Sequence, residues 1–204
     1  MKYFIIILVV ITLLATTYAF LQNSEQPETK KNNDTAEMQI NQNTKSLQND
    51  SLFNEHKTAP ELTGITAWLN LPARQQSLTI SSLRGKVVLI DFWTNQCINC
   101  IHTLSYVTKW YDTYKQQGFV TIGVHTPELA SEYTIDSIQR AIDQYNIHYP
   151  VAQDNNYKTW NAYNNEYWPA FYLIDKKGII RRTHFGEGEY NETEQAIETL
   201  LAEK

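Results

Sequence analysis

The chain has 204 residues and a formal net charge of −5, with 22 acidic residues against 17 Lys and Arg. This acidic balance argues against nucleic acid and anionic membrane surfaces as partners. With only two cysteines, Cys97 and Cys100, the chain cannot build a disulfide scaffold, so the pair is free to be functional.

The N-terminal segment, residues 1–21, is expected to export the chain. A single Lys precedes an apolar run over residues 4–15, and residues 17–19 (Thr-Tyr-Ala) fit a small-residue cleavage site. The apolar run continues weakly to residue 21 and is almost long enough to span a bilayer, so a signal peptide and a retained signal anchor both remain open. Either predicts an extracytoplasmic protein, in the periplasm or at the cell surface, that is membrane-anchored or secreted.

Residues 22–58 are expected to form a disordered polar linker. The segment is rich in Asn, Gln, Thr, Lys, Glu and Asp and has scarcely any aromatic residues. Such a composition cannot bury enough apolar surface to offset the loss of conformational entropy on folding. If the anchor is retained, the linker would let the following domain reach about 35 Å from the membrane.

Residues 59–204 are expected to fold as one domain with a buried core, since about 145 residues is a usual size for a single domain. Residues 87–92 are an apolar, β-branched run typical of a strand buried on both faces, and the sequence then changes to helical spacing. Before this strand we expect a hairpin of residues 68–70 and 78–80. After the helix we expect a strand at 119–124, a helical insertion from 126, an amphipathic helix at 135–145 and a strand at 149–152. The remaining elements are a helix at 158–163, an antiparallel hairpin of 170–175 and 179–185, and a capped final helix from 191.

The two cysteines lie where the buried strand passes into the helix. Exposed N–H groups and the positive end of the helix dipole favour a thiolate there. Cys97, nearer the helix tip, is the expected nucleophile, and Cys100, one turn further in, is the expected buried resolving thiol. The pair is therefore predicted to cycle between a dithiol and a redox-active Cys97–Cys100 disulfide.

Other uses of a Cys-x-x-Cys pair fit this sequence less well. Haem attachment needs a His directly after the second cysteine, and Ile101 stands there. A structural zinc site needs four ligands, and the chain has no second cysteine pair or close His pair to supply them, so no metal is expected. A structural disulfide remains open, although bridging so short a loop removes little entropy from the unfolded chain.

Two stretches of the chain resemble a known family. Asp-Phe-Trp-x-x-x-Cys-x-x-Cys, which begins at Asp91, is similar to the active-site strand and helix of thioredoxin-fold proteins. Residues 83–100 and 167–175 resemble the extracytoplasmic thioredoxin-like domain of the DipZ group, relatives of TlpA and ResA, over about residues 60–204. The resemblance implies an α/β thioredoxin fold of three α/β/α layers with a mixed sheet, an N-terminal β-hairpin and a helical insertion of the TlpA-like type.

The resemblance also implies roles for residues around the cysteines. Asp91 occupies the position of the buried acid of thioredoxins, a proton acceptor for Cys100, and an acid on so apolar a strand is costly to bury unless it is neutral or paired. The alternative is that Asp91 faces water at a strand end. Trp168-Pro169 is expected to be a cis peptide beside the cysteines, and Trp93, Trp168 and Pro169 are expected to bind the substrate.

Three further residues are weaker candidates. Glu128 resembles a glutamate near the active site of ResA-like reductases, but it is equally well explained as a first-turn residue favoured by the helix dipole after Pro127. His102 and His125 could donate protons, although such residues are more often on the surface or packed in the core.

The sequence thus predicts a thiol-disulfide oxidoreductase that acts on protein substrates with cysteine pairs in the reductive direction, including apocytochromes as candidates. No bound cofactor is required. Because one cysteine pair is spent after a single turnover, electrons must be renewed, and the resemblance implies a transmembrane electron carrier of the DsbD/CcdA type. Longer family members fuse such a carrier to this domain, whereas this chain does not contain one.

Two alternatives come from other classes. Thr94 and Cys97 form the Thr-x-x-Cys pattern of peroxiredoxins, but Ile90 stands where those enzymes carry a proline and Cys100 is too close to be their usual resolving cysteine. A non-enzymatic binding module would instead use the Trp168 surface for binding and keep the cysteines as a structural disulfide.

Overall fold

The computed structural model describes residues 52–204 of the chain. The predicted signal segment 1–21 and the predicted linker as far as residue 51 lie outside the described residues. None of the helices in residues 52–204 is both long enough and apolar enough to cross a membrane.

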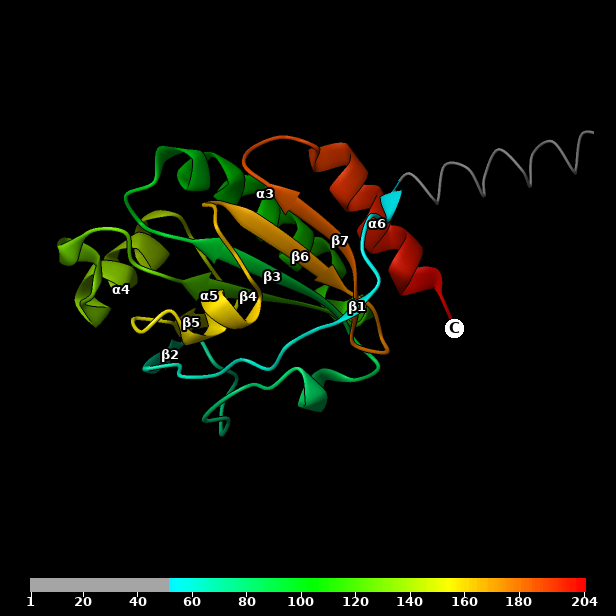
Figure 1. Ribbon diagram of the computed structural model, residues 1–204, viewed down its shortest axis with the longest axis horizontal. Coiled ribbons are helices and arrows are strands. Elements are labelled where there is room, and N and C mark those ends of the chain that lie inside the picture. The colour runs from blue at the N-terminus through cyan, green and yellow to red at the C-terminus, as the bar shows by residue number, and fades with distance from the viewer. Residues whose placement is uncertain (1–51) are drawn as a thin grey trace, which may run out of the picture. The chain divides into compact units, whose positions relative to one another are not determined.

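A seven-stranded mixed sheet forms the centre of the domain, in the order β1-β7-β6-β3-β4-β5-β2. In Figure 1, β3 lies between β6 and β4, and the register makes β3 parallel to β4 and antiparallel to β6. Every residue of β3 is buried, which confirms the prediction from its apolar sequence. The strands are β1 (Lys57–Thr58), β2 (Ala67–Leu69), β3 (Val87–Trp93), β4 (Phe119–His125), β5 (Val151–Gln153), β6 (Ala170–Ile174) and β7 (Ile179–Phe185).

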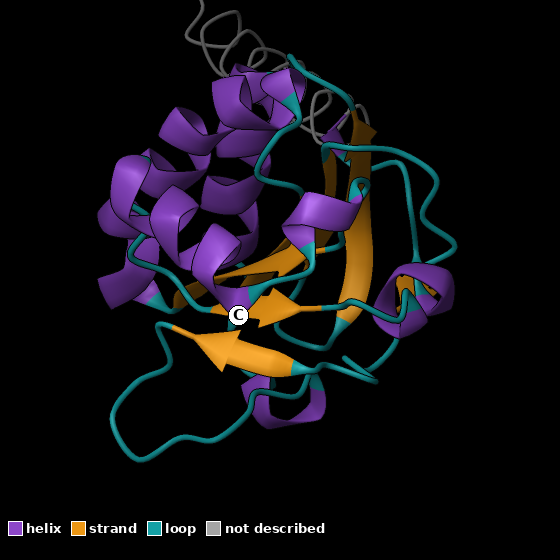
Figure 2. Ribbon diagram, turned by 90° about the vertical axis from the view of Figure 1, so that its left-hand side faces the viewer, coloured by secondary structure: helices purple, strands orange, loops and turns teal. Residues whose placement is uncertain are grey.

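Successive side chains of β3 point to opposite faces of the sheet and enter two separate cores. Val87, Leu89 and Trp93 pack with helices α3 (Ile98–Tyr114), α4 (Ile135–Gln144) and α6 (Tyr190–Ala202). Val88, Ile90 and Phe92 pack with α5 (Lys158–Ala162) and the segment that precedes β3. Figure 2 shows most of the helices gathered on one side of the strands. The mixed sheet with helices on both faces agrees with the predicted α/β architecture.

The predicted N-terminal hairpin is wrong. Residues 67–69 do form a strand, but β2 pairs antiparallel with β5 at the edge of the sheet. Residues 78–80 form no strand, because Leu78 and Ile80 are buried in the α5-side core and the backbone N–H of Ile80 donates to the carboxylate of Glu61 at 2.7 Å. A side chain from nineteen positions earlier thus takes the hydrogen bond that a strand partner would have taken.

The packed domain begins earlier than the predicted boundary at residue 59. β1 pairs antiparallel with β7, and Leu52 is buried. The side-chain amide of Asn54 donates to the carbonyl of Thr183 and accepts from its N–H, both at 2.8 Å, so it replaces a strand neighbour at this edge of β7. Residues 52–58, predicted as linker, therefore belong to the folded domain.

The segment between β4 and β5 is helical, although its first turn differs from expectation. Residues 126–129 form an irregular loop, followed by a short 3-10 helix (Ala130–Glu132) and then α4, which Thr134 caps by accepting from the N–H of Ser137 at 3.3 Å. The amphipathic helix predicted at 135–145 is confirmed. The cap predicted for the last helix is wrong, because α6 begins at Tyr190 after Glu189 in a left-handed conformation with no side-chain cap.

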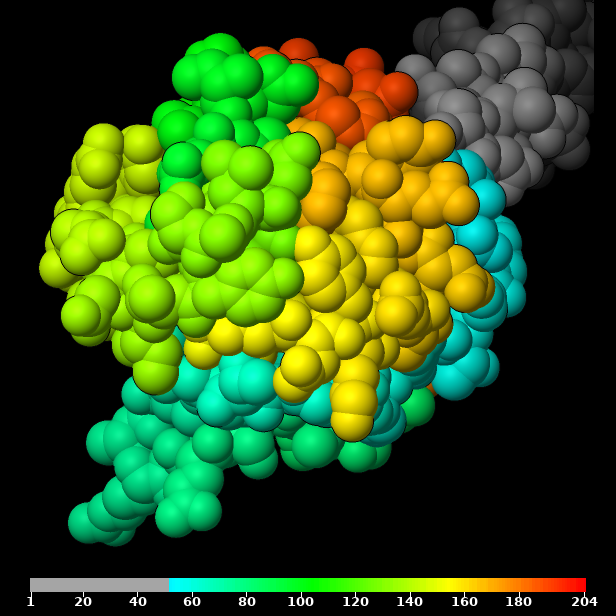
Figure 3. Space-filling view, turned by 60° about the vertical axis from the view of Figure 1, so that its left-hand side comes forward, coloured from blue at the N-terminus to red at the C-terminus, as the bar shows by residue number. Residues whose placement is uncertain are grey.

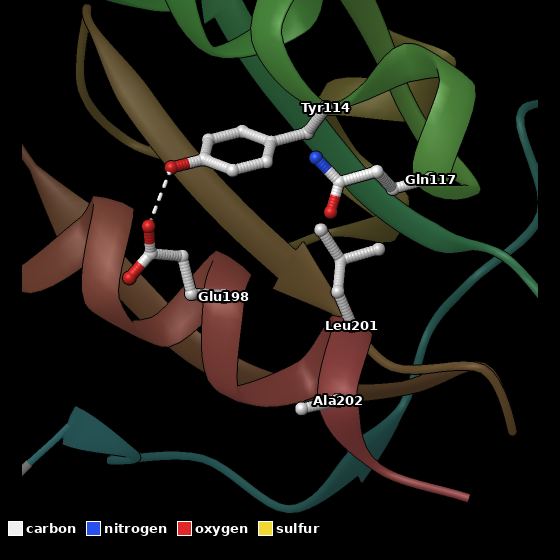
Figure 4. A pocket seen from close by; sticks show the side chains of 5 residues that line it. All are labelled: Tyr114, Gln117, Glu198, Leu201 and Ala202. Carbon is white, nitrogen blue, oxygen red and sulfur yellow. Dashed lines mark hydrogen bonds between the residues drawn. The ribbon is translucent and has the colours of Figure 1, made fainter.

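Polar contacts join α3 to α6 at the end of α3 that is remote from the cysteines. The hydroxyl of Tyr114 donates to Glu198 at 2.7 Å, as Figure 4 shows, beside a cavity of about 410 Å³ that is also lined by Gln117 and Leu201. Because α3 rises about 1.5 Å per residue, this cavity lies on the order of 25 Å from the start of the helix.

Candidate active site

The cysteine pair lies at the turn between β3 and α3, as the sequence predicts. Cys97 is the N-cap residue of α3 and has an extended backbone, and its Sγ accepts a hydrogen bond from the N–H of Cys100 at 3.3 Å. Cys97 is partly exposed and Cys100 is fully buried, in the core that α3 covers. Both are free thiols, so the structure shows the dithiol form of the pair.

The two sulfurs have opposite electrostatic environments. Hydrogen bonding by the neighbouring Cys100 thiol, aided by the N–H groups of Cys100 and Asn99, lowers the pKa of Cys97 to about 7 despite its partial burial. Burial raises the pKa of Cys100 well above the usual value of a thiol, and the nearby charges of Cys97 and Asp91 raise it further. Near neutral pH, Cys97 is therefore available as a thiolate while Cys100 keeps its proton.

Asp91 lies on the same side of β3 as the cysteines. The alternation of β3 directs its side chain toward α3 together with those of Leu89 and Trp93, and the residue is fully buried. No described residue donates a hydrogen bond to either carboxylate oxygen. Burial raises the pKa of Asp91 to about 8, and the negative charge of Cys97 contributes to the same shift. The alternative in which Asp91 faces water at a strand end is wrong.

Two aromatic residues and a glycine enclose Asp91, and sequence analysis missed two of these three. Gly123 of β4 is the register partner of Asp91. A Cβ atom on Gly123 would lie 2.9 Å from Nε1 of Trp93 and 3.0 Å from Cε2 of Tyr149, so only a glycine lets these rings pack so closely against β4. The Tyr149 hydroxyl is buried, and burial and the charge of Asp91 raise its pKa well above the ordinary value. Asp91 thus lies fully buried beside Gly123, near the place where the rings of Trp93 and Tyr149 pack against β4.

Trp93, which was expected to bind substrate, lies in the core of this structure. Trp93 is fully buried, and its ring meets that of His125 edge to face at a centroid distance of 5.3 Å. Because period-two alternation turns Trp93 to the same face as Leu89, it contributes to the core and presents no surface to a partner.

The Trp168-Pro169 peptide is cis, as predicted. Pro169 directly precedes β6, and the first residue of β6, Ala170, pairs with Phe92 near the end of β3. Pro169 therefore lies at the end of the central strands from which the Cys97 turn begins. Trp168 is half-buried; its indole N–H donates to the carbonyl of Thr126 at 3.1 Å. Trp168 and Pro169 therefore lie at the same end of the central strands as the cysteine turn, with Trp168 partly exposed and Pro169 buried.

The three weaker candidates have different surroundings. Glu128 is exposed in the loop after β4, close enough to Cys97 for its negative charge to raise the pKa of that thiol. His102 is exposed and lies 3.2 Å from a carboxylate oxygen of Glu187, as a surface residue would. His125 is fully buried, and burial lowers its pKa to about 4, so it is neutral near pH 7. Only Glu128 lies where it influences the cysteines.

Glu132 is part of the site and was not predicted. It is fully buried, and its carboxylate accepts hydrogen bonds from the N–H groups of Gln96, Glu128 and Leu129 at 3.1, 2.7 and 2.7 Å. A Glu that reaches back to the start of its own helical turn is half of a capping box, but Leu129 stands where the pattern requires Ser or Thr. The local sequence signal is therefore incomplete, and the contact with Gln96 has no local signal at all.

The arrangement supports thiol-disulfide exchange without a bound group. It provides an exposed nucleophile, a second thiol one turn away and a buried acid beside the second thiol. Within residues 52–204, no group of three or more His, Cys, Asp or Glu side chains converges as a metal site would require.

Comparisons with known proteins agree with this geometry. A profile of the AhpC/TSA family matches residues 57–183. Protein DipZ of Mycobacterium tuberculosis (strain CDC 1551 / Oshkosh) is 51% identical over 144 residues, which cover 71% of this chain and 21% of DipZ. The thiol-disulfide oxidoreductase YkuV of Bacillus subtilis (strain 168) is 31% identical over 144 residues, which cover 71% of this chain and 94% of YkuV.

A solved structure is similar over the same region. The crystal structure of the thioredoxin-like superfamily protein SPOA0173 aligns with a TM-score of 0.66 and 30% identity, over 72% of this chain and 98% of that protein. The match establishes a thioredoxin-like fold here. The chain spans about a fifth of the length of DipZ, so the similarity to DipZ concerns one part of that protein.

Proposed function

Since this chain belongs to the AhpC/TSA family and is a thiol-disulfide oxidoreductase with a thioredoxin-like fold, we propose that it reduces disulfides in exported proteins. The observation that carries this proposal is the asymmetry of the two thiols. Cys97 is partly exposed with a pKa lowered to about 7, and Cys100 is buried with a raised pKa. A thiol that is ionised near the ambient pH is close to the optimum for attack on a disulfide.

The first step joins the enzyme to its substrate. The Cys97 thiolate attacks one sulfur of the substrate disulfide, that S–S bond breaks, and the other substrate sulfur leaves as a thiolate. The product is a mixed disulfide between Cys97 and the substrate. Trp168 and Pro169, beside the turn, are positioned to contact the bound segment, whose backbone we expect to be extended.

The second step releases the substrate and needs a base. Cys100 transfers its proton to Asp91 and attacks the sulfur of Cys97; the mixed disulfide breaks, and the substrate leaves with two thiols once it takes up protons. Two electrons have then passed from the cysteine pair to the substrate, and Cys97–Cys100 is a disulfide.

The first step prepares Asp91 for the second. The charge of the Cys97 thiolate contributes to the raised pKa of Asp91, and this charge disappears when Cys97 enters the mixed disulfide. The pKa of Asp91 therefore falls at the stage at which Cys100 must lose its proton. A larger fraction of Asp91 is then ionised and able to accept it.

The location and the electron donor follow from the same proposal. The apolar segment 4–15 and the polar segment after it support an exported domain, either tethered to the membrane or secreted. A transmembrane electron carrier of the DsbD/CcdA type would reduce the Cys97–Cys100 disulfide after each turnover.

A trapping experiment tests the proposal. With Cys100→Ser, Cys97 still attacks a disulfide but nothing displaces the partner, so a mixed disulfide that a reducing agent cleaves should accumulate. With Cys97→Ser, the remaining thiol is buried and should capture little, which makes this variant the matched control. We expect the trapped partners to be extracytoplasmic proteins with cysteine pairs, apocytochromes among them. Equal trapping by both variants, or by neither, would contradict the exchange mechanism.

Peroxide reduction is a second candidate, because residues 94–97 show the Thr-x-x-Cys pattern of peroxiredoxins. The local geometry favours it less, because the Thr94 hydroxyl has no hydrogen-bond partner among residues 52–204, whereas the Sγ of Cys97 accepts from the N–H of Cys100. Insulin reduction and hydrogen peroxide consumption by the same preparation distinguish the two. We expect the purified chain to reduce insulin efficiently and to consume peroxide slowly.

A non-enzymatic binding module with a structural disulfide is the third possibility that the sequence left open. Titration of free thiols in the purified chain, before and after a mild reductant, tests it. We expect both cysteines to become titratable without unfolding and to close again with a small disulfide oxidant.

A further inference from the structure

Glu132 joins the turn that carries Cys97 to the loop that carries Glu128. One carboxylate oxygen accepts from the N–H of Gln96, the residue directly before Cys97, and the other accepts from the N–H groups of Glu128 and Leu129. The two sides of this contact are 36 residues apart in sequence. The side chain is fully buried, so water does not compete for its three hydrogen bonds.

Two other contacts hold the same segments together. The side-chain amide of Gln96 donates to Oγ of Ser131 at 2.6 Å, and that of Asn95 donates to the carbonyl of Ser137 at 3.0 Å. These partners belong to the segment between β4 and β5, which Figure 3 shows in yellow-green against the green start of α3. The turn before Cys97 is therefore bound to this segment at three places, and of the side chains that make these contacts only that of Glu132 is fully buried.

The loop that Glu132 holds also reaches the substrate side of the site. The carbonyl of Thr126 accepts from the indole N–H of Trp168 at 3.1 Å, and the carbonyl of Pro127 accepts from the hydroxyl of Tyr157. A change in this loop would consequently move Glu128 relative to Cys97 and loosen the contact with Trp168.

We propose that Glu132 is a positioning residue that fixes Cys97 at a set distance from Glu128, a role that rests on the proposed exchange chemistry at Cys97. A carboxylate suits this position because its two oxygens accept from three N–H groups at once. A Gln side chain has a single oxygen, and its NH₂ group would face an N–H donor. Glu132→Gln should therefore release one side of the contact while keeping the size of the side chain.

The test is a double-mutant cycle on the acidity of Cys97, measured with the full chain. Four proteins are compared: wild type, Glu128→Gln, Glu132→Gln and the double variant. The pH dependence of iodoacetamide alkylation of the reduced proteins at low salt gives the pKa of Cys97, since buried Cys100 reacts slowly. We expect Glu128→Gln to lower this pKa in the wild type, and to lower it by less than half as much when Glu132 is Gln.

Equal effects of Glu128→Gln in both backgrounds would overturn the proposal. That result would leave the proposed exchange activity intact, because the trapping experiment with Cys100→Ser tests the activity independently. If Glu132→Gln does not fold, the same cycle with Glu132→Asp applies, because Asp keeps the charge but is too short to reach both segments.

Asp175→Asn is the matched control. Asp175 is another buried carboxylate that accepts from backbone N–H groups, those of Lys177 and Ile179 at 2.8 and 3.0 Å. It lies after β6, at the end of that strand away from Pro169. We expect the effect of Glu128→Gln to be unchanged when Asp175 is Asn. If Asp175→Asn reduced that effect as much as Glu132→Gln does, general loosening of the fold would explain both and the proposal would fail.

Discussion

Two fully buried carboxylates lie near the cysteine pair, and their surroundings are opposite. Asp91, whose charge acts on Cys100, receives no hydrogen bond from any of residues 52–204, and burial raises its pKa to about 8. Glu132 accepts from three backbone N–H groups, one of them that of Gln96, the residue before Cys97. Burial disfavours the ionised form of any carboxyl, whereas N–H donors stabilise it. The comparison shows that two acids removed equally from water can differ entirely in the backbone donors around them.

The difference matches two kinds of task. An acid without donors changes its protonation when a nearby charge changes, so Asp91 can respond to the state of Cys97. A carboxylate with three backbone donors is held in one place, so Glu132 can fix a backbone turn. Replacing the carboxyl group by an amide should therefore change the free energy of unfolding in opposite directions at the two positions.

The largest expected effect is on the resolving step. Asp91→Asn removes the proton acceptor of Cys100, so the decay of the mixed disulfide near pH 7 should slow by about 10²-fold. Rapid mixing of the reduced variant with a disulfide-linked fluorescent peptide separates the attack by Cys97 from the release. Attack should be nearly unchanged, and Asp175→Asn should leave both steps unchanged. If release were as fast in Asp91→Asn as in the wild type, Asp91 would have no part in the mechanism.

Stability provides the second test, because the two substitutions should shift it in opposite directions. Asp91→Asn removes an acid that is costly to ionise in the core and should raise the free energy of unfolding at pH 8 by about 1–4 kcal/mol. Glu132→Gln leaves a buried N–H without its acceptor and should lower it by about 1–3 kcal/mol. Urea denaturation of the reduced proteins measures both. Changes of the same sign would contradict the comparison.

The gain from Asp91→Asn should depend on pH in a defined window. The pKa of Asp91 rises from its ordinary value of about 4 to about 8 on folding, so the folded state prefers the proton. The contribution of Asp91 to stability is complete below pH 4 and is lost as the pH rises to 8. The advantage of the Asn variant over wild type should grow across this window and then level off. An advantage that was the same at pH 4 and pH 8 would show that Asp91 ionises normally.

Much of the site was predictable because its signals are local. A buried β-branched run, two cysteines at the following helix start and an acid at Asp91 lie within a few positions of one another, and the structure agrees with each. The cis peptide before Pro169 was predictable only from the family resemblance, which places such a proline just before an apolar strand. The burial of Trp93 was not, because a strand apolar on both faces does not show which of its side chains reach a surface.

The missed features depend on contacts between distant segments. Ile80 lies in an apolar stretch that resembles a strand, but its N–H bonds to the carboxylate of Glu61. The carboxylate of Glu132 accepts from the backbone N–H of Gln96, 36 residues away. Because almost every residue has a backbone N–H, this contact requires no particular residue type at position 96. Period and spacing describe one element at a time, so neither contact leaves a pattern in the sequence.

A fourth prediction concerns the packing around Asp91. In Gly123→Ala, the new Cβ would lie 2.9 Å from Nε1 of Trp93 and 3.0 Å from Cε2 of Tyr149, so both rings must shift. We expect a loss of about 1–3 kcal/mol in the free energy of unfolding from this overpacking. Trp93→Phe removes the indole nitrogen, so the double variant should lose less than the sum of the single losses. Strictly additive losses in urea denaturation would contradict the predicted contact.

The smallest expected effect separates a surface carboxyl group from the two buried ones. Glu128 is exposed, and its charge is the weakest of the influences on the pKa of Cys97. Glu128→Gln should therefore lower that pKa slightly and raise the alkylation rate of Cys97 at pH 6 by about twofold, because interactions of exposed charges are weak. In 1 M salt, where the Debye length is about 3 Å, the difference from wild type should nearly vanish. Asp91→Asn should change the resolving rate by a similar factor at low salt and in 1 M salt, since salt screens the interactions of a buried group much less than those of an exposed one. A Glu128 effect that survived high salt would mean that Glu128 contacts Cys97 directly, and the contrast between surface and interior acids would then have to be redrawn.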